Sequence, residues 1–331
     1  MANIQQILKR FKKYNPRGDA ALIEKSYQFA FKAHQGQKRI SGADYITHCL
    51  NTAKTLANWK LDSETIAAAL LHDILDDTKI TPQELEKEFG ENILRMVKGG
   101  CKIDEIKYQG SQRKVENFRK LILATAQDIR VVLVKLSDRL HNMQTLAVLP
   151  PEKQKRIALE TLEIYAPIAS RLGMGELKGQ LEDLAFPYVY PKEYQWLINH
   201  TQEQRREREE FLKKIKGLLE EKLKGEGFTI FEIHSRTKHQ YSLYKKLLRH
   251  DNDLNKIHDL VALRILVSEI KDCYAVLGSI HKLWKPLPGR IKDYIALPKL
   301  NGYQSLHTTV FTLDGRLVEI QIRTKKMHYE A

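Results

Sequence analysis

The sequence predicts an α+β protein with two folded parts joined by a helical connector. Three observations support this class. The chain has 331 residues, which suits two domains. Apolar residues recur at helical spacing through about residue 225, and from about Phe228 short strand-like runs alternate with helical segments. We therefore expect an all-helical domain over 1–150, a helical connector over 151–225 and a mixed α/β domain over 226–331.

Composition narrows the class further. The chain is 42% hydrophobic and 29% charged, which is ordinary for a protein with buried cores. It contains no apolar run near the roughly 18 residues that span a bilayer, and its start, Met1–Ile4, lacks the apolar core of a signal peptide. The cysteines at 49, 101 and 273 form no zinc or redox spacing, so we expect a cytoplasmic protein with no membrane partner.

The formal net charge of +14 indicates a polyanionic partner. A nucleotide, a nucleic acid and an anionic surface all fit this charge. Charge alone does not choose among the three, so the choice depends on motifs.

Helical signals dominate the first 150 residues. Thr81-Pro82-Gln83-Glu84 has the spacing of a capping box with proline at the first helical position, so it begins a helix. The valine-rich segment after Asp128 also resembles a strand, but the polar residues 137–142 favour a helix. The other expected helices run over 21–33, from His48 to about Trp59, from about Ser63 through the acidic stretch 72–77, and from Asp128 to about Leu146.

The acidic stretch is His72-Asp73-Ile74-Leu75-Asp76-Asp77, which we predict to lie on one helix with Ile66, Leu70 and Ile74 on its buried side. Its three acids crowd a helix C-terminus, where the macrodipole disfavours negative charge. A divalent cation would offset that cost. The alternative is a solvated acidic helix end with an unrelated histidine.

Histidines and aspartates on three predicted helices form a candidate metal site. His48, the pair His72-Asp73, and Asp138 can converge in a helical bundle. Two imidazoles and two carboxylates suit a divalent transition-metal ion, which lowers the pKa of a bound water and so supplies a nucleophile at neutral pH. Each residue alone is more often a surface or capping residue.

The segments around these residues resemble a known family. His48, His72-Asp73 and Asp138, in that order on helices, resemble the HD phosphohydrolase superfamily. The flanking segments are more specific and resemble the hydrolase half of RelA/SpoT homologues, which make and destroy guanosine tetra- and pentaphosphate. These segments are His34–Arg39, Ser41-Gly42, Tyr45–His48, Leu71–Asp73 and Val134–Met143.

The resemblance implies roles for these residues. Asp76-Asp77 stands where the family has a Glu-Asp pair that acts on the attacking water, so Asp76 is one methylene shorter than usual. Arg39 matches a basic residue near the substrate phosphates, and Asn142 matches an asparagine on the nucleotide side. Ile40 departs from the usual lysine. The manganese ligands implied by the resemblance, all kept here, are His48, His72, Asp73 and Asp138, so we expect an active hydrolase.

The second half shows strand signals. We expect strands over Phe228–Ile233 and Leu260–Val267, and a helix from Tyr274 to Leu283. Thr308–Leu313 and Arg316–Ile322 should form a hairpin that turns at Asp314-Gly315.

Two patterns in this half suit nucleotide chemistry. On a helix, Lys238, Ser242 and Lys246 fall on one face with Arg236 at its entry, and such cations and a hydroxyl suit a triphosphate. Asp259 and Glu319 lie at neighbouring predicted strands and could share a magnesium ion. The alternatives are a basic surface helix and the solvated face of a sheet. The loop 288–308 mixes cations with an aromatic residue, which suits phosphates and a stacked base.

This half resembles the RelA/SpoT synthetase domain, whose fold is similar to nucleotidyltransferases and which moves pyrophosphate from ATP to the 3′-hydroxyl of GDP or GTP. The segments that carry the resemblance are Ile291–Ala296, Asn301–Ser305, His307–Thr309 and Glu319–Thr324. It implies magnesium ligands at Asp259 and Glu319, with Glu319 also deprotonating the hydroxyl, and guanine stacking by Tyr303. The implied ATP-phosphate residues are Arg236, Lys238, Ser242 and Lys246, and the other residues lining the site are Arg290, Lys292, Lys299, Asn301, His307 and Gln321.

The sequence therefore predicts a bifunctional enzyme of guanosine tetraphosphate metabolism, with manganese in one site and magnesium in the other. A hydrolase with an inactive second domain is the alternative. Nucleic-acid binding is a different class, although no helix-turn-helix or RNA-binding signature is present. Long members of the family add regulatory domains that bind stalled ribosomes. Those domains lie outside this sequence, which leaves open whether it is a fragment or a short form.

Overall fold

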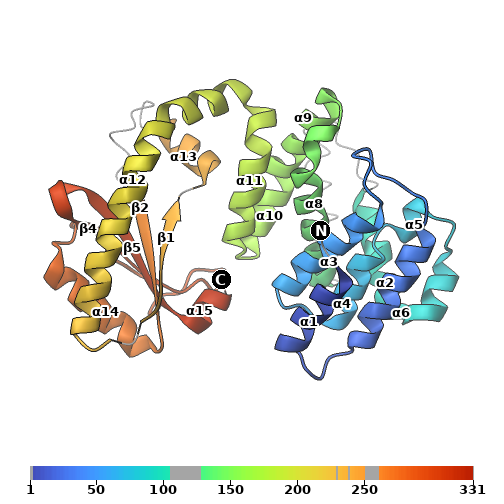
Figure 1. Ribbon diagram of the computed structural model, residues 1–331, viewed down its shortest axis with the longest axis horizontal. Helices are drawn as coiled ribbons and strands as arrows, with labels where there is room; N and C mark the ends of the chain where they lie inside the picture. The colour runs from blue at the N-terminus through green and yellow to red at the C-terminus, as the bar shows by residue number, and fades with distance from the viewer. Residues whose placement is uncertain (1–2, 105–127, 229, 238, 250–260, 331) are drawn as a thin grey trace. The chain divides into compact units, whose positions relative to one another are not determined.

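The structure is a computed structural model that describes residues 3–104, 128–228, 230–237, 239–249 and 261–330. The chain divides into two compact units, Met1–Tyr165 and Ala166–Ala331 (Figure 1). Among the described residues, no helix has the length and apolarity that a membrane crossing requires. The predicted boundaries at 150 and 225 stay predictions.

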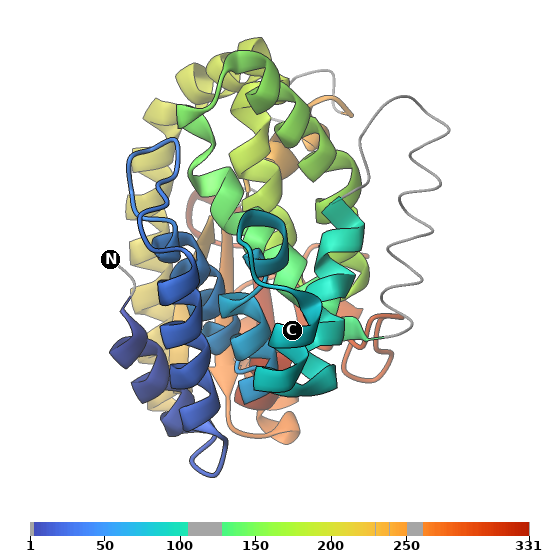
Figure 2. The ribbon, with the colours of Figure 1, turned by 90° about the vertical axis from the view of Figure 1, so that its right-hand side faces the viewer.

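The described residues of the first unit fold mainly into helices, as the sequence predicts. Figure 2 turns this unit toward the viewer and shows the blue to teal helices lying side by side. Its helices are α1 (Ile4–Tyr14), α2 (Ala20–Ala33), α3 (Ile46–Asn58), α4 (Ser63–Leu70), α5 (Ile74–Asp77), α6 (Pro82–Asp104), α8 (Ile129–Gln144) and α9 (Pro151–Glu160), with short turns η1 (Leu146–Val148) and η2 (Thr161–Tyr165).

Helix α4 is the centre of this unit. It contacts α2, α3, α6 and α8. Its residues from Thr65 to Leu70 are all buried, and three consecutive alanines keep the helix thin enough for neighbours on every side. α3 and α8 also contact one another, so α3, α4 and α8 pack against each other.

One helix expectation is wrong. His72, Asp73, Asp76 and Asp77 do not share a single helix, because α4 ends at Leu70 and α5 begins at Ile74. Successive residues of an α-helix point about 100° apart, so a continuous helix would separate His72 from Asp73. The break instead brings His72 Nε2 within 3.0 Å of Asp73 Oδ2. Ile66, Leu70 and Ile74 are fully buried, as predicted.

The second unit combines helices with a five-stranded sheet. The strand order is β1-β2-β5-β4-β3, in which β2 and β5 are parallel and the other pairs antiparallel. Its elements are α10 (Ala166–Arg171), α11 (Gly175–Val189), α12 (Pro191–Gly225), β1 (Ile230–Thr237), α13 (Gln240–Leu247), β2 (Val261–Val267), α14 (Ile270–Leu283), β3 (Lys292–Asp293), β4 (Leu306–Phe311), η4 (Leu313–Gly315), β5 (Leu317–Thr324) and α15 (Lys325–Glu330).

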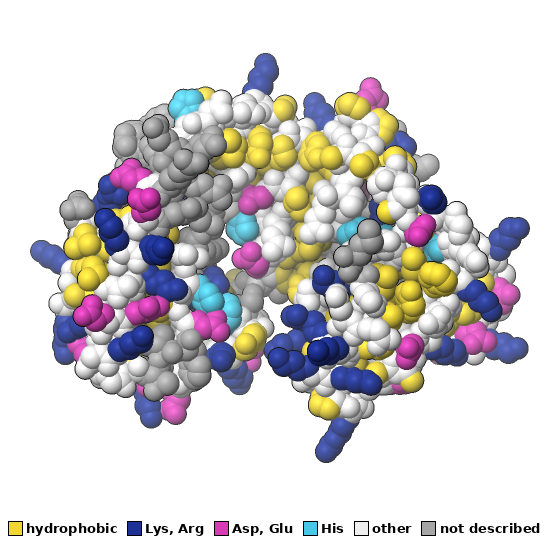
Figure 3. All heavy atoms as spheres, in the orientation of Figure 1, with side chains coloured by type: hydrophobic (Ala, Val, Ile, Leu, Met, Phe, Trp, Pro, Cys, Tyr) yellow, Lys and Arg dark blue, Asp and Glu magenta, His cyan; other side chains and the backbone are white. Residues whose placement is uncertain are grey.

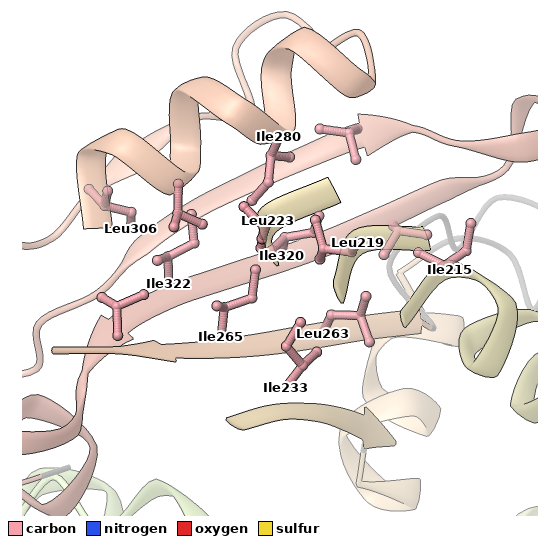
Figure 4. Packing of buried hydrophobic residues seen from close by; sticks show 14 of the residues in the cluster. Ile215, Leu219, Leu223, Ile233, Leu263, Ile265, Ile280, Leu306, Ile320 and Ile322 are labelled. Carbon is pink, nitrogen blue, oxygen red and sulfur yellow. The ribbon is translucent and has the colours of Figure 1, made fainter. Parts of the chain in front are cut away.

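The core of this unit lies on one face of the sheet. Figure 4 shows Leu219 and Leu223 of α12 and Ile280 of α14 packed against Ile320 and other aliphatic residues of the central strands. Alternation along β5 buries Val318, Ile320 and Ile322. The same alternation turns Glu319 and Gln321 toward the opposite face, where the predicted site residues lie.

Two local expectations in this unit need correction. Arg236 does not enter a helix, because β1 extends to Thr237 and pairs Arg236 with Ala262 of β2, while α13 begins only at Gln240. The cross-strand ladder outweighs the local helical pattern here. The β4–β5 hairpin exists as predicted, but its connection contains the short helix η4 in place of a two-residue turn.

Candidate functional site

Four side chains of the helical unit converge on one point. His48 comes from α3, His72 and Asp73 from the break after α4, and Asp138 from α8. His48 Nε2 lies 3.1 Å from His72 Nε2, 3.1 Å from Asp138 Oδ1 and 3.5 Å from Asp73 Oδ2. The two imidazoles are each only 2% exposed. Buried nitrogen and carboxylate ligands this close together form a group that fits a divalent metal ion, as in an HD domain.

Both imidazoles are oriented through their other ring nitrogen. His72 Nδ1 lies 2.8 Å from the carbonyl oxygen of Ala69, so it donates a hydrogen bond there. His48 Nδ1 lies 2.7 Å from Nδ1 of His141 on α8. Each Nε2 therefore faces the cluster, which is the arrangement that metal-binding histidines adopt when a neighbour holds the ring.

Asp138 is supported by polar neighbours. The ammonium of Lys135, itself only 2% exposed, lies 3.6 Å from Asp138 Oδ2. Asn142 Nδ2 donates to Asp138 Oδ1 at 2.6 Å, and Arg39 donates to the side-chain Oδ1 of Asn142 at 2.8 Å. Arg39, Asn142 and Asp138 are thus connected, and Asn142 and Asp138, four residues apart on α8, share one helix face.

These contacts shift the protonation of the cluster. Burial by itself raises the pKa of the Asp138 carboxyl, but Lys135 and the hydrogen bonds from His48 and His72 hold that pKa well below its usual range. Burial likewise opposes ionisation of Asp73, yet His72 lowers the Asp73 pKa. Burial lowers the pKa of His48, so its imidazole is neutral. Burial disfavours the charged form of His72, but Asp73 and Asp138 outweigh it and raise the pKa of His72 to about 10, so a bound cation would displace the proton of His72 while the carboxylates stay anionic.

The two predicted acids, Asp76 and Asp77, make different contacts in the structure. Asp77 accepts a hydrogen bond from the hydroxyl of Tyr45, and the same hydroxyl lies 2.7 Å from Asp73 Oδ2. Asp76 is exposed on α5. Tyr45 stacks on His34 with ring centroids 4.6 Å apart. The sequence motif contained Tyr45 without giving it a role, although its position three residues before His48 was a signal.

The cluster forms one wall of an open pocket of about 530 Å³. Arg39, Tyr45 and Asn142 line this pocket together with His48, Asp73 and Asp138. Further along, Arg156 joins apolar residues that include Ile157. Cations next to the ligand cluster and an apolar extension suit a phosphorylated substrate with an uncharged ring.

The second candidate site lies on the polar face of the sheet. Cross-strand pairing places Lys292 of β3 opposite His307 of β4, and His307 opposite Gln321 of β5. His307 Nδ1 lies 3.0 Å from Glu319 Oε1, and Gln321 donates to the same oxygen at 3.3 Å. The structure therefore brings four predicted residues of this half into one row.

Tyr303 lies beside this row. Its hydroxyl is 2.9 Å from His307 Nε2, and the Lys299 ammonium is 5.1 Å from its ring centroid. Arg290 and Asn301 are exposed on the adjoining loop. The tyrosine ring therefore has cationic surroundings, which suits a base with attached phosphates.

The predicted phosphate residues of this half are only partly described. Ser242 and Lys246 lie on α13, and the Ser242 hydroxyl is 3.5 Å from Glu182 Oε2 of α11. Asp259 and Lys238 lie outside the described residues. The strand predicted to follow Asp259 is β2, and the strand that contains Glu319 is β5. The prediction that these two strands are neighbours is confirmed, since Ala262 of β2 pairs with Glu319 of β5.

The fold and these sites define an HD-type helical domain followed by a mixed-sheet, synthetase-like domain. Family models agree: an HD domain matches residues 26–175, and the region found in RelA / SpoT proteins matches residues 235–331. The chain belongs to the RelA/SpoT family.

Three similar proteins support this membership. The chain is 48% identical over 330 residues to a guanosine-3′,5′-bis(diphosphate) 3′-pyrophosphohydrolase of Aquifex aeolicus, covering 99% of the chain and 47% of that protein. It is 46% identical to a GTP pyrophosphokinase of Myxococcus xanthus, covering 95% and 42%. It is 45% identical to the bifunctional (p)ppGpp synthase/hydrolase SpoT of Escherichia coli, covering 95% and 45%. The chain thus spans about half the length of the curated relatives it matches.

Proposed function

We propose that this chain carries both halves of guanosine tetraphosphate metabolism. The helical unit removes the 3′-pyrophosphate of guanosine tetra- or pentaphosphate with Mn²⁺. The second unit transfers pyrophosphate from ATP to the 3′-hydroxyl of GDP or GTP with Mg²⁺. The names of relatives at 45–48% identity support this pair of reactions. The observation that carries the proposal is the buried group of His48, His72 and Asp138 at the wall of a pocket.

In the hydrolase site, His48, His72, Asp73 and Asp138 would hold the metal. A divalent ion supplies there the activation of a water at neutral pH. Asp77, held by Tyr45, lies at the cluster and can orient that water or accept its proton. Asp76 is exposed and extends the same acidic surface.

Arg39 and Asn142 serve the substrate of this site. The Arg39 guanidinium lines the pocket and can donate to phosphate oxygens, while its bond to Asn142 fixes its direction. Asn142 in turn is held by Asp138, so binding of phosphate and binding of metal share one chain of hydrogen bonds.

In the synthetase site, Glu319 would hold Mg²⁺ together with Asp259 and accept the proton of the 3′-hydroxyl. His307 and Gln321 fix its carboxylate by two hydrogen bonds to Oε1, so its position on the polar face of the sheet is well defined. Tyr303 would stack on guanine beside Lys299. The ATP phosphates would lie on Arg236, Lys238, Ser242 and Lys246, with Arg290, Lys292 and Asn301 completing the site.

Two observations keep alternatives open. Glu182 of α11 accepts a hydrogen bond from the Lys245 ammonium at 2.7 Å and lies 3.5 Å from the hydroxyl of Ser242. A carboxylate next to the predicted phosphate-binding residues of α13 disfavours a bound triphosphate, so this contact favours a hydrolase-only protein. Lys and Arg side chains also gather over α1, as Figure 3 shows, and this surface would suit nucleic acid. The exposed cations of α1 are Lys9, Arg10, Lys12 and Lys13.

Two incubations test the proposal. Guanosine tetraphosphate with Mn²⁺ should yield GDP and pyrophosphate, and radiolabelled ATP with GDP or GTP and Mg²⁺ should yield the 3′-pyrophosphorylated product. Hydrolysis without synthesis would support the hydrolase-only alternative. Neither reaction, together with a salt-dependent gel shift of RNA, would support nucleic-acid binding and contradict the proposal. The expected cytoplasmic location stays a prediction.

A further inference from the structure

His141 occupies an unusual place in the helical unit. It lies on α8, three residues after Asp138, and is 9% exposed. Its Nδ1 faces Nδ1 of His48 at 2.7 Å, and the two ring centroids are 4.9 Å apart. His141 contacts the Nδ1 of His48, whereas the Nε2 on the other side of that ring faces His72, Asp73 and Asp138. His141 therefore contacts a proposed ligand from the side away from the cluster.

Hydrogen-bond chemistry restricts this pair of rings. Two facing nitrogens at this distance need one proton between them, so one donates and the other accepts. His48 Nε2 faces His72, Asp73 and Asp138, and a nitrogen that binds a metal ion carries no proton. The proton of the neutral His48 ring must then lie on Nδ1, which makes His141 Nδ1 the acceptor.

The partner of the second imidazole provides a comparison. His72 Nδ1 faces the carbonyl oxygen of Ala69, and a carbonyl oxygen can only accept. That partner fixes the His72 ring without further help. His141 can accept only while its own proton is on Nε2, so the orientation of His48 depends on a side chain that substitution can change.

We propose that His141 is a positioning residue that accepts the hydrogen bond of His48 Nδ1 and so directs His48 Nε2 toward the divalent cation. The inference rests on the proposed metal site of the helical unit. Loss of such a hydrogen-bond partner behind a ligand typically weakens metal binding by about 10- to 100-fold.

Two substitutions at this position separate the acceptor from mere filling of space. The Oδ1 of asparagine can occupy the place of the histidine Nδ1, so His141→Asn keeps an acceptor, while His141→Leu fills part of the volume without one. Mn²⁺ affinity of the full chain is measured by calorimetry at pH 7. We expect His141→Leu to bind Mn²⁺ about 10- to 100-fold more weakly and His141→Asn to stay within about threefold of the unsubstituted protein, far less than one lost bond costs.

Controls identify which hypothesis fails. Asp73→Asn gives the binding that remains without this metal site, and His281→Leu removes a histidine that bonds Thr308 in the other unit. Equal Mn²⁺ binding by the unsubstituted protein and Asp73→Asn would refute the proposed metal site itself. Normal binding by His141→Leu, or equal weakening by the leucine and asparagine variants, would overturn the role of His141 alone.

A measurement on the unsubstituted protein does not depend on whether the leucine variant folds. Nitrogen-15 NMR of the imidazoles, recorded with diamagnetic Zn²⁺ bound in place of paramagnetic Mn²⁺, reports which ring nitrogen carries the proton. We expect His48 protonated on Nδ1 and His141 on Nε2. A proton on Nδ1 of His141 would make it the donor and contradict the proposal.

Discussion

Replacing Lys135 by methionine should destabilise the metal-free protein strongly, because Lys135 is the buried cation that faces Asp138. Its side chain is 2% exposed and its ammonium lies 3.6 Å from Asp138 Oδ2. Methionine nearly matches the lysine stem, and Gly100 of α6 leaves room beside that stem. The packing should therefore survive while the charge is lost, which leaves Asp138 buried with less compensation.

Removing one partner of a buried ion pair costs about 3–5 kcal/mol. For a unit of this size, each kcal/mol lowers the melting temperature by about 2–4 °C, so Lys135→Met should lower it by about 6–20 °C. The matched control is Lys25→Met. Lys25 pairs with Glu88 at 3.0 Å, but both side chains are about half exposed, so its loss should cost less than about 1 kcal/mol.

Mn²⁺ distinguishes charge compensation from packing. A bound divalent cation compensates Asp138 in place of the missing ammonium, so Mn²⁺ should raise the melting temperature of Lys135→Met more than that of the unsubstituted protein. Calorimetric melting with chelator and with saturating Mn²⁺ measures both increments. An equal increment in the two proteins, or a loss no larger than that of Lys25→Met, would refute the role of Lys135.

Four further outcomes are expected. Asp73→Asn should abolish hydrolysis of guanosine tetraphosphate and leave synthesis intact, because it removes a metal ligand of the helical unit alone; unchanged hydrolysis with full metal content would refute its assignment. Glu319→Gln should do the reverse at saturating Mg²⁺, and normal synthesis by this variant would count against its role. Tyr303→Ala should weaken GDP binding about tenfold to a hundredfold, since stacking contributes about 1–3 kcal/mol, whereas Tyr303→Phe keeps the ring; equal losses for an ATP analogue would point to a structural cap. Hydrogen bonds to Asp183 and Glu176 raise the pKa of His239 to about 9. The protonated side chain therefore stabilises the folded protein fully below its unfolded pKa of about 6.5, and this contribution is lost as pH rises toward 9. The free energy of unfolding of His239→Gln, measured in urea across this pH range, should lack this decline.

The convergence of His48 and Asp138 could be predicted because it follows from helix periodicity. His48 and Asp138 lie on the inward faces of α3 and α8, and those faces are fixed by the spacing of apolar residues around them. The break between α4 and α5 could not be predicted in the same way. Ile66, Leu70 and Ile74 keep a four-residue spacing across it, so the local pattern stays helical while the packing of the site determines the turn at His72 and Asp73.

The second unit shows the same limit in its strands. Alternation along β5 puts Glu319 and Gln321 on one face of the sheet, and the pairing with β4 adds His307 to it. Arg236 was misplaced because a short segment with mixed polar and apolar residues fits both a strand end and a helix entry. Arg236 belongs to strand β1 because it pairs with Ala262 of β2, a residue 26 positions away in the sequence, and the local pattern does not contain this information.

The residues that were missed have their partners far away in the sequence. Tyr45 meets Asp77 across 32 residues, and His48 meets His141 across 93. Periodicity tells which face a side chain occupies, but the partner on that face depends on how α3, α8 and the break after α4 approach one another. His141 follows Asp138 by three residues and so shares its helix face, which was a usable signal. The positions three and four residues after Asp138 are His141 and Asn142. The first contacts His48 Nδ1 and the second donates to Asp138 Oδ1, so helix spacing alone points to both residues.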